Sequence, residues 1–209
     1  MLRRSVVLLA LLLLLAPPSH AGGRESRSTM HRVDLAEKVK PGQRLDIDLE
    51  TGGSIEIEVW DRNEVQVVSD YAERECPEAR IRFSPTSTGA LLESDFESEP
   101  GVHNCSLSFT IKVPRRFDVH VVSAGGELRV ADVHGRVDGR TGGGNLELVG
   151  VRGTVRLRIG GGEIAARDCD LDGTLSTGGG AVRFENVVGD VVATSGSLSR
   201  PVRGQPRRR

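Results

Sequence analysis

Apolar and polar residues alternate along most of the chain that follows residue 40. In the segment SIEIEVW, for example, Ile55, Ile57 and Val59 fall on one face and acidic residues on the other. A period of two is typical of β-strands that bury one face. After Ala21 no segment keeps a helical spacing of apolar residues, so the pattern predicts an all-β protein. The clearest predicted strands are RLDIDLE at 44–50, SIEIEVW at 54–60, EVQVV at 64–68, ARIRF at 79–83 and SLSFTIKV at 106–113.

A glycine-rich segment recurs at a constant spacing in the second half: SAGGELRV at 123, TGGGNLEL at 141, IGGGEIAA at 159 and TGGGAVRF at 177. Aligning the copies gives columns of matched character. The apolar columns are Leu128, Leu146, Ile164 and Val182; Val130, Leu148, Ala166 and Phe184; and Val133, Val151, Cys169 and Val187. A turn-forming column contains Asp132, Gly150, Asp168 and Asn186.

Self-similarity at a short fixed period predicts a β-solenoid in which each repeat is one coil of about 18 residues. Equivalent strands would stack about 4.8 Å apart, and the apolar columns would form continuous ladders inside a narrow tube. The glycines would form a corner with positive φ, which Cβ atoms would otherwise crowd. A hairpin sandwich is the alternative, but it does not require matched columns over four copies without an insertion.

Proline and glycine mark a boundary within the chain. Residues 115–200 contain no proline, and 18 of the 26 glycines lie between 117 and 199. Proline cannot donate to a strand ladder, so its absence favours continuous pairing on both sides. We therefore expect a strand-rich N-terminal portion at 22–114, continuous with β-solenoid repeats at 115–199.

The two ends have compositions of their own. Residues 1–21 have two arginines, an apolar run of about a dozen residues and a Ser19-His20-Ala21 end, which is the layout of a signal peptide cleaved after Ala21. The alternative is an uncleaved anchor, for which the run is short. The protein is thus expected to be exported to the periplasm, the cell surface or the medium, with no transmembrane span after cleavage. The tail at 200–209 has five arginines and no acid, and is expected to be disordered.

The segment LDIDLETGGSIEIEVWDRNEVQV at 45–67 and the later G-G-x-[LIV]-x-[LVAF] copies resemble a family of bacterial envelope domains of unknown function, provisionally labelled adhesins. The resemblance covers most of the chain after the leader. It implies a right-handed parallel β-helix in an exported protein, and it supplies no catalytic motif to transfer onto individual residues.

The best candidate for metal chemistry is DCDLDG at 168–173, where Asp168, Asp170 and Asp172 alternate before a glycine, as at the start of an EF-hand loop. The bidentate closing position holds Gly179, however, and the three aspartates are also explained by a turn and two outward columns. A calcium-binding nonapeptide is excluded, because its aspartate column contains only Glu147 among Arg129, Ala165 and Arg183. Calcium at the three aspartates stays open, and no metal ligand is assigned.

No other chemistry is indicated by the sequence. His31, His103, His120 and His134 lack zinc-ligand spacing, and no nucleophile elbow is present. We therefore expect no catalytic residue, no cofactor and no enzyme activity. Nucleic-acid binding is not expected, because between the leader and the tail 21 basic residues face 29 acidic ones and few aromatic residues are available.

Two further expectations concern the cysteines and the function. Export permits a disulfide, which we expect between Cys76 and Cys105 in the less regular first half, while Cys169 stays a buried free thiol in a valine column. The function expected is a non-catalytic, adhesin-like binding module for a glycan or an envelope protein, whose identity the sequence does not give. The alternative is a structural envelope protein that self-assembles end to end.

Overall fold

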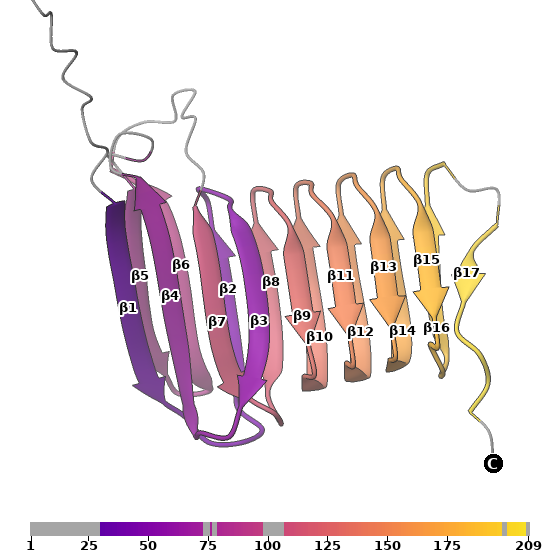
Figure 1. Ribbon diagram of the computed structural model, residues 1–209, viewed down its shortest axis with the longest axis horizontal. Helices are drawn as coiled ribbons and strands as arrows, with labels where there is room; N and C mark the ends of the chain where they lie inside the picture. Colours follow the sequence, from indigo (N-terminus) through magenta and orange to yellow (C-terminus); the bar gives the residue numbers. More distant parts are fainter. Residues whose placement is uncertain (1–29, 73–75, 77–78, 98–106, 198–199, 208–209) are drawn as a thin grey trace, which may run out of the picture.

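The structure is a computed structural model that describes residues 30–72, 76, 79–97, 107–197 and 200–207. These residues form strands and turns, with no helix among them (Figure 1). The all-β prediction is therefore confirmed. The strands are β1 (Met30–Lys38), β2 (Arg44–Leu49), β3 (Ser54–Trp60), β4 (Glu64–Ala72), β5 (Ala79–Thr86), β6 (Gly89–Phe96), β7 (Ser108–Pro114), β8 (Asp118–Ser123), β9 (Leu128–Ala131), β10 (His134–Thr141), β11 (Leu146–Val149), β12 (Arg152–Ile159), β13 (Ile164–Arg167), β14 (Asp170–Thr177), β15 (Val182–Glu185), β16 (Val191–Ser195) and β17 (Val202–Arg203).

The strands lie in two mixed sheets with one apolar core (Figure 1). We call them sheet A, in the order β1-β4-β7-β3-β9-β11-β13-β15, and sheet B, in the order β17-β16-β14-β12-β10-β8-β2-β6-β5. Antiparallel pairs occur towards the ends, between β1, β4 and β7, between β5 and β6, and between β16 and β17. The pairs in the middle of both sheets are parallel.

The period found in the sequence is the pairing register of the second half. Leu146 pairs with both Leu128 and Ile164 in sheet A, and Val155 pairs with both Val137 and Gly173 in sheet B. Each repeat thus contributes a short strand to sheet A and a longer strand to sheet B, as β11 and β12 illustrate. The predicted column of Val133, Val151, Cys169 and Val187 is buried throughout, at 2% exposure or less.

The two turns of each repeat have separate sequence requirements. In the turn column Asp132, Gly150, Asp168 and Asn186 all have φ between 53° and 64°, which glycine and short polar residues tolerate best. At the glycine corner, only the third glycine has positive φ: 94° at Gly144. A Cβ on Gly142 would meet the Ala124 carbonyl oxygen at 1.9 Å, whereas a Cβ on Gly143 would meet no atom within 4 Å. The corner therefore needs its first glycine for close stacking and its third for backbone conformation.

The first half of the chain joins the same two sheets, but out of sequence order. Strand β2 lies between β6 and β8, and β3 lies between β7 and β9. The chain thus forms β2 and β3, then adds β4, β5, β6 and β7 on one side of them, and continues with β8 and β9 on the other side. Here Leu45 pairs with Val119. The sequence separation between these two residues is not a multiple of the repeat period, so column alignment does not reveal the pairing.

The C-terminal tail departs from the expectation of disorder. Strand β17 pairs antiparallel with β16, and the amides of Gly204 and Gln205 donate to the carbonyl oxygens of Val191 and Val187 at 3.0 and 2.8 Å. Arg207 then reaches the acidic side chains of β14. Residues 200–207 therefore cover the last repeat, because an open strand edge and two acidic side chains are available to them.

Candidate functional site

The outer face of sheet B has a concentration of arginine on β10 and β12. We call it the arginine face: Arg136, Arg140, Arg152, Arg156 and Arg158, all of them exposed. The alternation of side chains along each strand places these arginines on the outer face, because residues between them in sequence point into the core. Val137 and Val155 are fully buried, as are the neighbouring Leu157 and Ile159 at 3% or less. The guanidinium groups thus project from a backbone that the core holds rigidly.

None of these five arginines forms an ion pair with another residue in the described part of the chain. The outward acids of β8 and β10 have other hydrogen-bond partners. Asp138 accepts a 2.8 Å hydrogen bond from the His120 ring at Nδ1, and Asp118 accepts one from the backbone amide of Arg136 at 2.8 Å. The arginine face therefore presents cationic side chains that form no ion pair, although the carboxylates of Asp118 and Asp138 lie beside them on β8 and β10.

Sheet A has an outer face of the opposite kind. There Arg129 binds Glu56 at 3.1 Å and also Glu147, which in turn binds Arg167. Arg183 binds Glu163. The hydrogen bond from Arg129 to Glu147 raises the pKa of the Arg129 guanidinium above its usual value. Both faces come from the same repeats. The absence of ion pairs for the five arginines on sheet B is therefore a difference in sequence and not in architecture.

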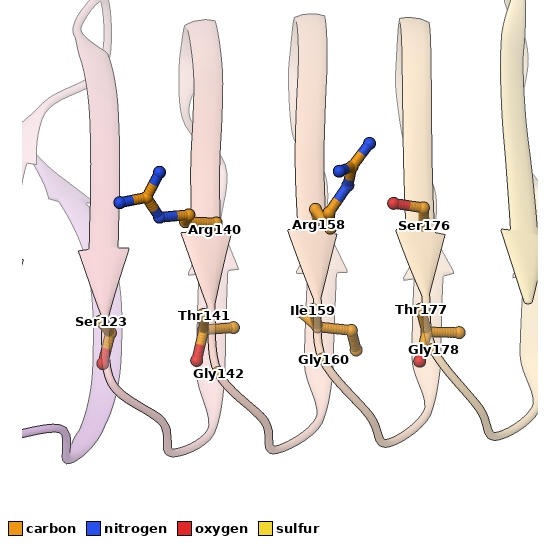
Figure 2. A pocket seen from close by; sticks show the side chains of 10 residues that line it. All are labelled: Ser123, Arg140, Thr141, Gly142, Arg158, Ile159, Gly160, Ser176, Thr177 and Gly178. Carbon is orange, nitrogen blue, oxygen red and sulfur yellow. The ribbon is translucent and has the colours of Figure 1, made fainter.

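Two adjoining hollows lie beside Arg140 and Arg158, at the end of the arginine face next to the glycine corner. The first has a volume of about 560 Å³ and is lined by Ser123, Arg140, Thr141, Gly142, Arg158, Ile159, Gly160, Ser176, Thr177 and Gly178 (Figure 2). Figure 2 shows the guanidinium groups of Arg140 and Arg158 directed away from each other, to the two sides of their strands. The second hollow, of about 350 Å³, shares Arg140, Arg158 and Ser176 with the first and extends to His120 and Asp138. Both are open and shallow, suited to an extended ligand rather than an enclosed one.

The His120 ring has a carboxylate partner in Asp138. The two residues occupy one column of adjacent repeats, so column alignment could have revealed the pair. The hydroxyl of Ser176, in the same hollow, lies on β14. Because β8 and β14 are three strands apart and Ser176 lies two residues beyond the register of His120, the Cα atoms of His120 and Ser176 are about 16 Å apart. That distance excludes direct proton transfer between the two side chains.

The three aspartates considered for calcium have protein partners. Asp168 has φ of 54° in the turn column and accepts a hydrogen bond from Asn186 Nδ2 at 2.9 Å. Asp170 and Asp172 both bind Arg207. Within the described residues, no three His, Cys, Asp or Glu side chains are grouped as a metal site would require.

The cysteines lie away from the arginine face. Cys169 is a free thiol at 2% exposure, as predicted, and burial raises its pKa. Cys76 is also buried at 2%, but Cys105 lies outside the described residues, so their disulfide stays a prediction. The cleavage site after Ala21 lies outside them as well.

The remaining histidines have separate surroundings. His31 stacks on Tyr71 at 5.6 Å between ring centroids, on strands β1 and β4. His134 begins β10, where burial lowers its pKa and the charges of Arg152 and Arg115 lower it further. His103 lies outside the described residues. The described histidines thus lie on different strands, as expected for residues without ligand spacing.

Comparisons with known proteins give similarity in fold only. No family model matches the chain, and no curated protein matches it. A solved structure from Clostridium sporogenes, provisionally described as a cell adhesion protein, is 13% identical, covers 79% of this chain and 98% of its own, and has a TM-score of 0.47. Two provisionally described adhesins are similar: one from Parabacteroides distasonis (12% identity, 79% and 71% coverage, TM-score 0.41) and one from Bacteroides fragilis (14%, 79% and 96%, 0.37). In the described part of the chain, no helix has the length and apolar character needed to cross a membrane.

Proposed function

We propose that the protein is an exported, adhesin-like binding module that holds a glycan or another protein on the outer face of sheet B. The observation that carries this proposal is the arginine face, with five exposed guanidinium groups that have no acidic partner among the described residues. On sheet A the arginines are compensated by Glu56, Glu147 and Glu163. Side chains of one charge that lack ion-pair partners, held on a rigid sheet, are typical of a surface that binds an oppositely charged molecule.

The module binds its ligand without converting it. Nucleophilic catalysis needs a hydroxyl or thiol within hydrogen-bond reach of a base. At the arginine face the one base–carboxylate pair among the described residues is His120 with Asp138, and the Cα atoms of His120 and Ser176 are about 16 Å apart. The free thiol of Cys169 is buried, and its raised pKa keeps it protonated.

The repeats coil as a right-handed parallel β-helix in an exported protein. Parallel pairing at one constant offset in both sheets supports the coil, and the leader at 1–21 supports export. The periplasm, the cell surface and the medium are all compatible with this location. Anionic polymers are common partners in these compartments, and the arginine face would be accessible to them.

A glycan array probed with the protein from residue 22 onward tests this function. We expect reproducible binding to a subset of glycans, and loss of that binding in an R140Q/R158Q variant. A second array of envelope proteins covers protein ligands. If the protein binds nothing on either array, or if it converts a bound glycan into a shorter product, the proposed function is wrong.

End-to-end self-assembly is the second candidate, and one observation favours it. Within the described strands, β15 is the last strand of sheet A and has no hydrogen-bonded neighbour on its outer side. Such an edge can template another chain. In sheet B the corresponding edge of β16 is occupied by β17. Sedimentation velocity separates the two candidates: a monomer at high concentration excludes the filament, and concentration-dependent polymers exclude the simple binding module.

A further inference from the structure

We infer that the ligand of the arginine face is a linear polysaccharide that carries carboxylate or sulfate groups. This inference rests on the proposed function and adds the chemical class of the ligand. Guanidinium groups bind carboxylate and sulfate oxygens through two parallel hydrogen bonds, which ammonium groups do not match. All five basic residues of the face are arginines.

The shape of the arginine face selects a linear ligand. Along β12 the positive charge extends from Arg152 to Arg158, which is about 20 Å at roughly 3.3 Å per residue. Across the sheet the arginines come from two strands, β10 and β12, whose backbones are about 4.8 Å apart, and the guanidinium groups of Arg140 and Arg158 extend outward on either side (Figure 2). A stripe of this length and width fits a single extended chain that follows the strand direction.

Acidic residues lie on both sides of the stripe, and Asp138 lies within it between Arg136 and Arg140 of β10. On one side, Asp46 and Asp48 of β2 lie two strands from β10 on the same outer face. On the other, β14 presents Asp170 and Asp172, which Arg207 binds. Arg44 likewise binds Asp46 at 2.9 Å, so the carboxylate of Asp48 is the bordering charge that a flat anionic membrane or a nucleic-acid duplex would meet. A single polysaccharide chain can instead follow the outward residues of β12.

A protein partner fits the stripe less well. Stable protein interfaces bury about 800 Å² on each side and depend on a few buried aromatic or aliphatic anchors. On the flanking strands β8 and β14, the outer face has Val122 as its hydrophobic side chain, and Val192 follows on β16, one strand further out; both are already partly buried. Without an anchor the face offers charge and hydrogen bonds, which are what a hydrophilic anionic chain needs.

The test measures affinity for three immobilised polysaccharides by biolayer interferometry: heparin, with sulfate and carboxylate; polygalacturonate, with carboxylate only; and neutral dextran. Two variants are compared with the wild type. R140Q/R158Q removes two charges from the stripe, and R167Q/R183Q removes two charges from the compensated face of sheet A. Net charge is therefore equal in both variants, and thermal unfolding checks that both are folded.

We expect binding to at least one of the two anionic polymers, a fall in affinity with added salt, and no binding to dextran. R140Q/R158Q should bind at least about tenfold more weakly, because two charge-assisted hydrogen-bonding groups are lost. R167Q/R183Q should stay within about twofold of the wild type. Comparing heparin with polygalacturonate identifies whether sulfate or carboxylate is recognised.

Three results would overturn the inference: no binding to either anionic polymer, equal binding to dextran, or equal weakening in the two variants. Any of them leaves the proposed function standing if the arrays find another ligand that R140Q/R158Q fails to bind. If the arrays also find no ligand, the proposed function fails together with the inference.

Discussion

Arg207 and Asp172 are joined by two hydrogen bonds of 3.0 Å, from Nη2 of the arginine to both carboxylate oxygens. Nε of the same guanidinium donates to Asp170 Oδ1 at 2.8 Å, so the contact fixes the end of the tail that begins with β17. Substituting Arg207 with alanine should therefore release the tail and speed hydrogen exchange of the Gly204 amide several-fold. Arg203→Ala is the control, because Arg203 is exposed on the same segment and has no ion pair in the described chain. Equal exchange in both variants would show that β17 alone holds the tail.

The tail contact should also depend on pH. The hydrogen bonds from Arg207 and from the backbone amide of Asp190 lower the pKa of Asp172 below its usual value. A lowered pKa means that the contact is fully present above the ordinary Asp value of about 3.9 and is lost as the pH falls through the lowered one. After correction for intrinsic exchange rates, we expect the tail amides to stay protected from pH 8 to pH 5 and to open below about pH 4. Opening that begins near pH 6 would contradict this assignment.

The glycine corner gives a matched pair of substitutions in neighbouring residues. Gly144→Ala forces φ of 94° on a residue with a Cβ and places that Cβ 2.1 Å from the Gly126 carbonyl oxygen. We expect the free energy of unfolding to fall by about 2 kcal/mol or more. Gly143→Ala meets no atom within 4 Å and should change it by less than about 0.5 kcal/mol. Chemical denaturation measures both, and equal effects would mean that the corner is not built as described.

Two deletions test the period itself. Removing residues 141–158 joins Arg140 to Ile159, which stands in the register of Thr141, and restores every column. Stability should fall only modestly, since it is close to a sum of repeat and neighbour terms. Removing residues 141–149 instead joins Arg140 to Gly150 and shifts the later repeats by half a period, and we expect aggregation. Circular dichroism and size-exclusion chromatography compare the two, and equal damage would refute the coiled repeat.

The cysteine prediction is checked by mass spectrometry of the unreduced protein after proteolysis. We expect a peptide that links Cys76 to Cys105 and a Cys169 that reacts with thiol reagents only after unfolding. A bridge that closes a loop of about 30 residues would stabilise the fold by roughly 3 to 4 kcal/mol in the chain-entropy model. Any bridge to Cys169 would contradict its place in the buried valine column.

The sequence was most informative where structure is local or periodic. The alternation and the repeat period predicted which residues of successive repeats pair with each other, such as Leu128 with Leu146. They also predicted the turn column, whose residues have positive φ angles. These features depend on residues that are close in sequence or related by one constant offset. The buried state of Cys169 followed from its column in the same way.

Non-periodic relationships were missed for a physical reason. Nothing in the alternation of β2 indicates that its neighbours are β6 and β8, because any half-buried strand can pair with any other of similar pattern. The ordered tail was missed because its contacts with β16 and with Asp170 and Asp172 of β14 follow no repeat period, and a terminal basic segment has no alternation of its own. The arginine face was not predicted from the sequence. Its defining property is that its five arginines form no ion pairs, and the neighbours of a side chain on adjacent strands can be identified only when the strand register is known.

The constant offset has an evolutionary consequence. Tandem duplication of residues 141–158 would add a second copy of β12 beside the first, with its three arginines in register and both ends of the molecule unchanged. The cationic stripe would widen by one strand, or about 4.8 Å. Unequal recombination between neighbouring copies could therefore adjust the footprint of the protein in whole steps, without disturbing the core that supports it.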